Sequence, residues 1–150
     1  AIDLPIPAYI PAEYISETAL RIQLYRRLAD LHSAAAIDEI RAELADRFGP
    51  LPRAVEGLLY QLHVKLMASQ AHVTAIIQDG QKIGLKLPYL GQVDRNALQL
   101  ALGNDVRASR TAIWLNRSED ETTWMLALLD VLQKLGQQPI PTGTEEGAGL

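Results

Sequence analysis

The chain has 150 residues, of which 48% are hydrophobic, and this length suits one globular domain with a sizeable core. Its 14 basic and 18 acidic residues give a net charge of −4, which argues against a nucleic-acid-binding module without excluding a local basic patch. The absence of cysteine excludes disulfides, thiol catalysis and thiolate metal sites. No apolar run approaches the roughly 20 residues of a membrane span, and no secretory signal pattern opens the sequence. Because it begins at Ala1 inside an apolar segment, we expect a piece of a larger soluble protein.

The first 15 residues form a lead-in that contains Pro5, Pro7 and Pro11. Proline at this density favours an extended backbone and disfavours helix. A flexible linker would be polar, whereas this segment is apolar, so part of it should dock on this domain or on the rest of the protein. The side chains expected to dock are Tyr9, Ile10, Tyr14 and Ile15.

Three helices are predicted next, each from apolar residues at helical spacing. The first should run to about residue 32, with Ser16 as its N-cap. The second spans about residues 36–48, and the third about residues 52–69. Their apolar stripes are Leu20, Leu24, Leu28 and Leu31; Ile37, Ile40, Leu44 and Phe48; and Val55, Leu58, Leu59, Leu62 and Leu66.

The second and third helices should meet at a defined corner. Gly49 follows Phe48 at the position where a helix commonly closes with a left-handed residue, which only glycine adopts without steric cost. Pro50 lacks the N–H that would continue the helix, and Pro52 suits the first turn of the next one. Phe48 and Leu51 are expected to pack into this corner.

The polar faces of these helices offer the candidate site residues. Glu43 and Asp46 are three residues apart and should project side by side. Two adjacent carboxylates can form an acid–base pair, a metal site or a docking patch for cations, although a solvated face is the commonest outcome. Three arginines of the first helix also most often form a solvated face, with a binding patch as the minority interpretation. They are Arg21, Arg26 and Arg27.

After residue 72 the period of the pattern changes from 3.6 to 2, which predicts strands. Residues 73–78 and 82–87 should pair as a hairpin, because the Asp79-Gly80 dipeptide between them favours a tight two-residue turn. His63 and His72 flank this change of period, and neither has a carboxylate or a second histidine at ligand spacing. We therefore expect both histidines to be structural.

A short helix over residues 94–102 should begin at Asp94 as its cap and end at Gly103. Residues 105–108 and 111–116 should form a second hairpin that joins the first in one antiparallel sheet. The alternation of its last strand places Ile113 and Leu115 on one face and Trp114 on the other.

The last predicted helix runs from about residue 119 to 135. Ser118 and Glu121 form its capping box, and Gly136 should end it. Residues 137–150, which are rich in proline and glycine, are expected to be a disordered tail. The buried stripe of this helix should consist of Trp124, Leu128, Val131, Leu132 and Leu135.

The order of elements predicts an α+β domain in which the N-terminal helices and a long C-terminal helix pack with a small sheet of two hairpins. We expect an extended lead-in over residues 1–15, a single domain over residues 16–136 and a tail over residues 137–150. The sequence has no phosphate-binding glycine loop, dinucleotide fingerprint, nucleophile elbow or readable catalytic triad. Aromatic residues make up only 5% of the chain and are not interleaved with a basic run.

Several segments together resemble the C-terminal domain of the bacterial transcription-repair-coupling factor (Mfd). The resemblance is most specific over residues 8–60, and the order of elements matches up to about residue 136. The segments that carry it are Ala8-Tyr9-Ile10-Pro11, Tyr14-Ile15, Arg21, Leu24-Tyr25-Arg26-Arg27-Leu28, Ile40, Glu43-Leu44 and Asp46-Arg47-Phe48-Gly49-Pro50-Leu51-Pro52. The motif positions expected to be structural are Tyr9, Pro11, Tyr25, Arg47, Phe48, Gly49 and Pro50.

The resemblance implies that this chain is a non-catalytic regulatory domain of a cytoplasmic, ATP-driven translocase on double-stranded DNA. Such a parent displaces stalled RNA polymerase and recruits nucleotide excision repair through UvrA. In the family, this domain packs on the N-terminal UvrB-like module, masks the surface that UvrA needs and restrains the motor. The resemblance assigns Glu43 and Asp46 to that contact. It implies no cofactor in this domain, with ATP and magnesium used by the motor elsewhere, and no membrane partner.

Two other functions remain open from the residues alone. A nucleic-acid-binding module would use Arg21, Arg26, Arg27 and Arg47, and it predicts strongly salt-dependent binding to DNA. A small hydrolase would use Glu43 and Asp46, and it predicts a concave pocket with a raised carboxyl pKa.

Overall fold

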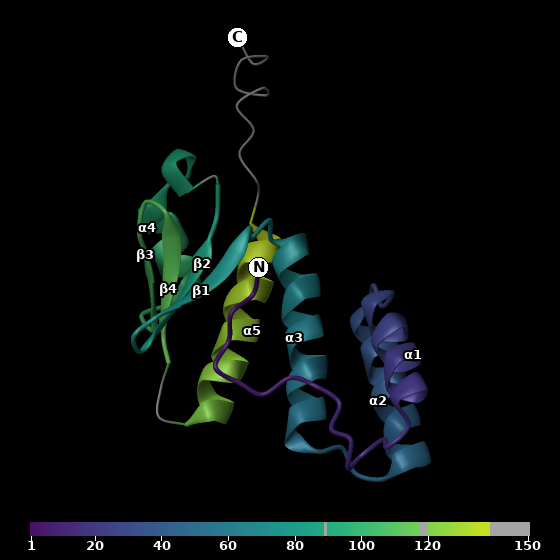
Figure 1. Ribbon diagram of the computed structural model, residues 1–150. Coiled ribbons are helices and arrows are strands. Elements are labelled where there is room, and N and C mark those ends of the chain that lie inside the picture. Colours follow the sequence, from purple (N-terminus) through teal and green to yellow (C-terminus); the bar gives the residue numbers. More distant parts are fainter. Residues whose placement is uncertain (89, 118–119, 139–150) are drawn as a thin grey trace, which may run out of the picture. The chain divides into compact units, whose positions relative to one another are not determined.

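The computed structural model describes residues 1–88, 90–117 and 120–138, and it confirms the predicted α+β class (Figure 1). The contacts divide the chain into two compact units. The helical unit consists of residues 5–66, and the sheet unit consists of residues 1–4 together with those from Met67 onward. The chain passes from one unit to the other between residues 4 and 5 and again within one helix, between Leu66 and Met67.

The helical unit contains α1 (Thr18–Ala29), α2 (Ala34–Phe48) and α3 (Arg53–Gln70) as far as Leu66. One apolar cluster draws residues from all three helices and from the lead-in, as the helical spacing predicts. Its buried members are Ile10, Ile15, Leu24, Leu28, Ile37, Ile40, Leu44, Val55 and Leu59.

The predicted N-cap of the first helix is wrong. Glu17, not Ser16, occupies the cap position of α1, and its side chain makes no capping hydrogen bond. The Arg21 guanidinium instead donates to the carbonyl oxygens of Ile15 and Ser16, at 2.7 and 3.0 Å. Ile15 is buried in the core, and Glu17 keeps an extended backbone with φ of −78° and ψ of 117°, so the helix begins only at Thr18. At α2 the capping residue is Ser33, whose hydroxyl accepts from the Ala36 N–H.

The lead-in contributes to both units. Within the sheet unit, Ile2 forms a parallel bridge with Ile76. Within the helical unit, Ile10 and Ile15 are buried and Tyr14 packs against the cluster, as expected. Tyr9 was also expected to dock, but its side chain is 53% exposed, because its docking contact is made by its backbone N–H to a carbonyl of α3.

The sheet unit contains β1 (Ala75–Asp79), β2 (Lys82–Lys86), β3 (Val106–Ala108) and β4 (Ala112–Asn116) in an antiparallel sheet of order β1-β2-β4-β3. The predicted turn is displaced by one residue. Asp79 pairs with Lys82, so the two turn residues are Gly80 and Gln81. Gly80, with φ of +61°, supplies the positive φ that a type II′ turn requires at its first central position.

Three helical segments complete the sheet unit, namely η1 (Leu90–Gln92), α4 (Arg95–Leu102) and α5 (Glu121–Gln137). The limits of α4 confirm the prediction, because the Asp94 carboxylate caps the helix and Gly103 closes it with φ of +93°.

Both predicted ends of α5 are wrong. Asp120 occupies the N-cap position in place of Ser118, which lies outside the described residues. Gly136 does not end the helix, since it lacks the positive φ seen at Gly49 and Gly103. The predicted stripe is nevertheless buried, at Trp124, Leu128, Val131, Leu132 and Leu135. Of the predicted tail, residues 139–150 lie outside the described residues.

Candidate functional site

The corner between α2 and α3 forms as predicted. Gly49 adopts φ of +89°, and an added Cβ would meet no atom within 4 Å, so the backbone conformation is what favours glycine there. Phe48 packs edge-on against Tyr14, with ring centroids 5.8 Å apart. The Tyr14 hydroxyl donates to the carbonyl oxygens of Leu44 and Gly49, at 3.0 and 2.8 Å. The lead-in therefore fastens the end of α2.

Glu43 lies at the centre of an ion-pair network beside this corner. Its carboxylate accepts two hydrogen bonds from the Arg27 guanidinium, at 2.7 and 2.8 Å, and one from Arg47 at 3.1 Å. The hydrogen bond from Arg27 is the main cause that lowers the pKa of Glu43 to about 2, with a further contribution from Arg47. Arg47 also lies over the Phe48 ring, 4.9 Å from its centroid.

Asp46 follows Glu43 by three residues on α2 and is exposed. Within the part of the chain that the structure describes, its carboxylate has no ion-pair partner. The structure therefore places both predicted carboxylates at the surface of α2, where Glu43 is ion-paired and Asp46 is not paired with any described residue. Sequence spacing could have indicated the Glu43–Arg47 pair, which is i,i+4, whereas the Arg27 pair depends on how α1 lies beside α2.

The ion pairs of Glu43 should give the helical unit a measurable pH dependence. Because the folded-state pKa of Glu43 is lowered, its stabilising effect is complete above the pKa of an unfolded glutamate and is lost as the pH falls from about 5 to about 2. With 34% of the side chain exposed, solvent screening limits this effect to about 1 kcal/mol.

Denaturant unfolding tests this dependence. Glu43→Gln should lower the free energy of unfolding at pH 7, and the difference from the unmodified chain should shrink at pH 3. Glu39→Gln is the matched control, because Glu39 is exposed and forms no ion pair with any described residue. A difference that stays constant with pH would contradict the assignment.

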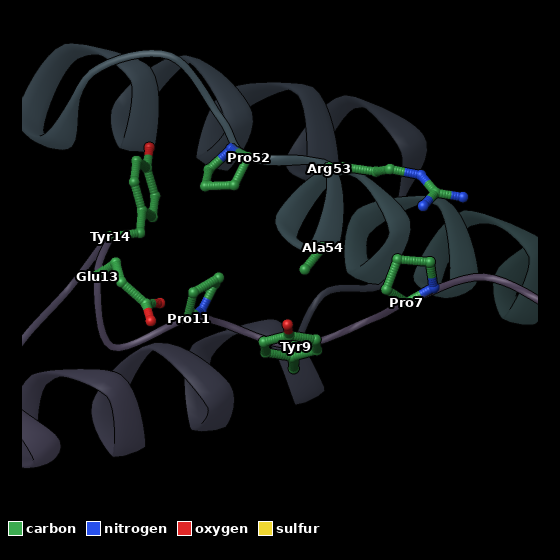
Figure 2. Close-up of a pocket in the computed structure, with 8 residues that line it drawn as sticks. All are labelled: Pro7, Tyr9, Pro11, Glu13, Tyr14, Pro52, Arg53 and Ala54. Atoms are coloured by element: carbon green, nitrogen blue, oxygen red, sulfur yellow. The ribbon is translucent and has the colours of Figure 1, made fainter.

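The other motif residues line or support a cleft of about 580 Å³ between the lead-in and the start of α3 (Figure 2). Tyr9 and Pro11 line the lead-in side, and Pro52 and Ala54 line the α3 side. Tyr25 supports the lead-in from α1, since its hydroxyl accepts a hydrogen bond from the Ile10 N–H at 2.7 Å. Pro50 is exposed at the corner.

The geometry does not support the hydrolase interpretation. That interpretation needs a raised carboxyl pKa in a pocket, whereas the pKa of Glu43 is lowered and neither Glu43 nor Asp46 lines the cleft. Among the described residues, no group of three metal-ligating side chains lies together. None of the helices in the described ranges is long and apolar enough to cross a membrane.

The arginines of the alternative nucleic-acid site are mostly engaged within the helical unit. Arg21 binds two carbonyl oxygens at the start of α1. Arg27 and Arg47 both pair with Glu43. Only Arg26 of the four has no hydrogen bond or ion pair with a described residue. This arrangement leaves little unpaired positive charge for phosphate binding.

Comparison with known proteins identifies a family for these residues. Residues 4–98 match the model of the TRCF domain. The chain is 30% identical over 148 residues to the transcription-repair-coupling factor of Bacillus subtilis (strain 168), which covers 89% of this chain and 12% of that protein. It is 37% identical over 75 residues to the transcription-repair-coupling factor of Haemophilus influenzae, which covers 50% of this chain and 6% of that protein.

A solved structure gives the same result for the fold. The crystal structure of the C-terminal domain of transcription-repair coupling factor superposes with a TM-score of 0.75 at 23% identity, covering 90% of each chain. The chain spans between 6% and 12% of the length of these curated relatives. The family match includes the lead-in, the Glu43 network and the corner at Gly49. This chain therefore belongs to the TRCF domain family, a domain of transcription-repair-coupling factors in DNA repair.

Proposed function

We propose that this domain regulates its parent protein by docking reversibly on an N-terminal UvrB-like module. Docking would mask the surface that UvrA needs and would restrain the motor until RNA polymerase is engaged. The observation that carries the proposal is the surface of α2, where Glu43 is held ionised beside the unpaired carboxylate of Asp46. We further propose that the domain is non-catalytic and needs no cofactor, and that the motor, which uses ATP and magnesium on double-stranded DNA, lies elsewhere in the parent.

The Glu43 network makes such docking reversible. Arg27 and Arg47 already make three hydrogen bonds to the Glu43 carboxylate, so a cation of the partner competes with them and the net gain is small. Asp46 has no such competitor among the described residues. A weak contact of this kind is sufficient within one protein, because tethering gives a high effective concentration. The same contact releases readily when the parent changes conformation.

Substitutions on α1 and α2 should change docking in opposite directions. Asp46→Ala and Glu43→Ala should each weaken binding to the N-terminal module by up to about fivefold at low salt, and moderate salt should reduce the effect. Arg27→Ala should strengthen binding, because it frees Glu43 for the partner. Titration of the separate module with this chain measures all three affinities.

The control is Asp38→Ala, which removes the same charge from an exposed residue about two turns earlier on α2. If Asp38→Ala and Asp46→Ala weakened binding to the module equally, the effect would come from net charge and not from a contact at Asp46. Unchanged affinity in the Glu43, Asp46 and Arg27 variants would place the contact elsewhere.

A further inference from the structure

The outer face of the sheet carries a partly exposed tryptophan at its centre. Ile113 and Leu115 of β4 are buried on one face, and Trp114 lies on the opposite face. The strand register places Trp114 between Gly84 of β2 and Arg107 of β3. The chain has one other tryptophan, Trp124 of α5, which is buried.

The Trp114 ring lies flat against the backbone of Gly84. A Cβ built on Gly84 would lie 2.7, 2.9 and 3.0 Å from three consecutive atoms of the six-membered ring, Cζ3, Cη2 and Cε3. A point in the plane of the ring would be much farther from the two outer atoms than from the central one, whereas a point above the ring is nearly equidistant. One face of the indole therefore packs on the sheet, and its exposed surface is on the other side.

Basic side chains surround this ring. Arg107 is the direct neighbour of Trp114 on β3, and Lys82 and Lys86 flank Gly84 on β2. All three are exposed, and none has an ion pair with any residue that the structure describes. The acidic residues nearest in register are Asp79, opposite Lys82, and Asp105, which precedes β3. Lys86 lies at the end of the face away from both carboxylates, and Arg107 lies in the same row as Trp114, two residues after Asp105. The three cations outnumber the two carboxylates on this face, although the whole chain is acidic.

We propose that this sheet face binds single-stranded nucleic acid, a function separate from docking through α2. A base would stack on the outward face of Trp114, while Lys86, Arg107 and Lys82 would contact the phosphates on either side. A flat aromatic ring flanked by cations is the combination that single strands require, because a duplex hides the faces of its bases. An acidic protein partner could pair with the three cations, but it would gain little from a planar aromatic ring.

Tryptophan fluorescence tests the stacking directly. Titration of the whole chain with a thymidine oligonucleotide at low salt should quench the emission of Trp114, while buried Trp124 supplies a constant background. Inorganic polyphosphate, which has charge but no bases, should bind without comparable quenching. A duplex of the same length should also quench less. Absence of quenching at saturating oligonucleotide, or equal quenching by polyphosphate, would overturn the proposal.

Variants separate the ring from the charges. Trp114→Leu should weaken oligonucleotide binding about tenfold, and Trp114→Phe should restore most of the loss because a ring remains. Lys86→Ala with Arg107→Ala should reduce the slope of log affinity against log salt by about 1.4. The matched control is Arg26→Ala with Lys65→Ala, two exposed cations of the helical unit, which should leave affinity nearly unchanged.

Fluorescence anisotropy of a labelled oligonucleotide reads all of these variants, and circular dichroism verifies that each one is folded. The Lys86 and Arg107 substitutions are at exposed strand positions, so their test does not depend on the fold of the Trp114 variants. If the double variant of Lys86 and Arg107 and the control double variant lost the same affinity for the oligonucleotide, the proposed location would be overturned. Failure of Trp114→Phe to recover binding would overturn the stacking.

Discussion

Replacing Gly57 with alanine is expected to destabilise the helical unit by about 3 kcal/mol, although alanine is the better helix former. Gly57 is buried in α3, where the lead-in crosses the helix. An added Cβ would lie 1.9 Å from the carbonyl oxygen of Pro7 and 3.1 Å from its carbonyl carbon. Both are backbone atoms, so no side-chain rotation relieves the overlap. The lead-in must therefore move away from α3 at Pro7.

The neighbouring hydrogen bond opposes that movement. The Tyr9 N–H donates to the Ala54 carbonyl oxygen, one turn before Gly57 on α3, at 3.1 Å. Beyond it, Ile10 is buried in the helical core. A displacement of Pro7 therefore strains a segment that is fixed two and three residues later, at Tyr9 and Ile10. This is why we expect a cost near the upper end of the range for overpacking.

Gly136→Ala provides the matched control. Gly136 also lies within a helix, α5, but an added Cβ there meets no atom within 4 Å. The same substitution should therefore be neutral or stabilise the chain by up to about 1 kcal/mol. Denaturant unfolding followed by circular dichroism measures both variants. A neutral Gly57→Ala variant would mean that the lead-in does not cross α3 as closely as the structure places it.

Gly57 also illustrates what the sequence could not predict. The apolar spacing of α3 predicted the helix, but a glycine within it indicated only a local cost in helix propensity. The crossing depends on Pro7, 50 residues earlier, and no local pattern records such a contact. The limits of α4 were predictable for the opposite reason, because its cap at Asp94 and its closing Gly103 both lie next to the helix.

Each candidate surface also has one part that the sequence could predict and one part that it could not. Glu43 and Asp46 could be recognised as an acidic pair on one helix, but the Arg27 partner that holds Glu43 ionised comes from α1. Alternation placed Trp114 on the outer side of its strand. To predict that the ring lies on Gly84 and beside Arg107, one would have to know the register of three strands. Residue spacing therefore predicts which side chains share an element, whereas their partners depend on how elements pair.

Removing the Tyr14 side chain is expected to have an effect as large as that of Gly57→Ala, and two substitutions divide it into parts. Tyr14→Phe removes only the hydroxyl that donates to the carbonyl oxygens of Leu44 and Gly49, and it should cost about 1 kcal/mol. Tyr14→Ala also removes the ring that packs against Phe48, and it should cost about 3 kcal/mol.

Tyr9→Phe is the control, because the exposed Tyr9 hydroxyl has no hydrogen-bond partner among the described residues, and its loss should change stability by less than about 0.5 kcal/mol. Denaturant unfolding at pH 7 compares the three variants. If Tyr14→Phe costs as little as Tyr9→Phe, the hydroxyl does not hold the end of α2. The end of α2 would then be fixed by the positive φ of Gly49 and by the packing of the Tyr14 and Phe48 rings.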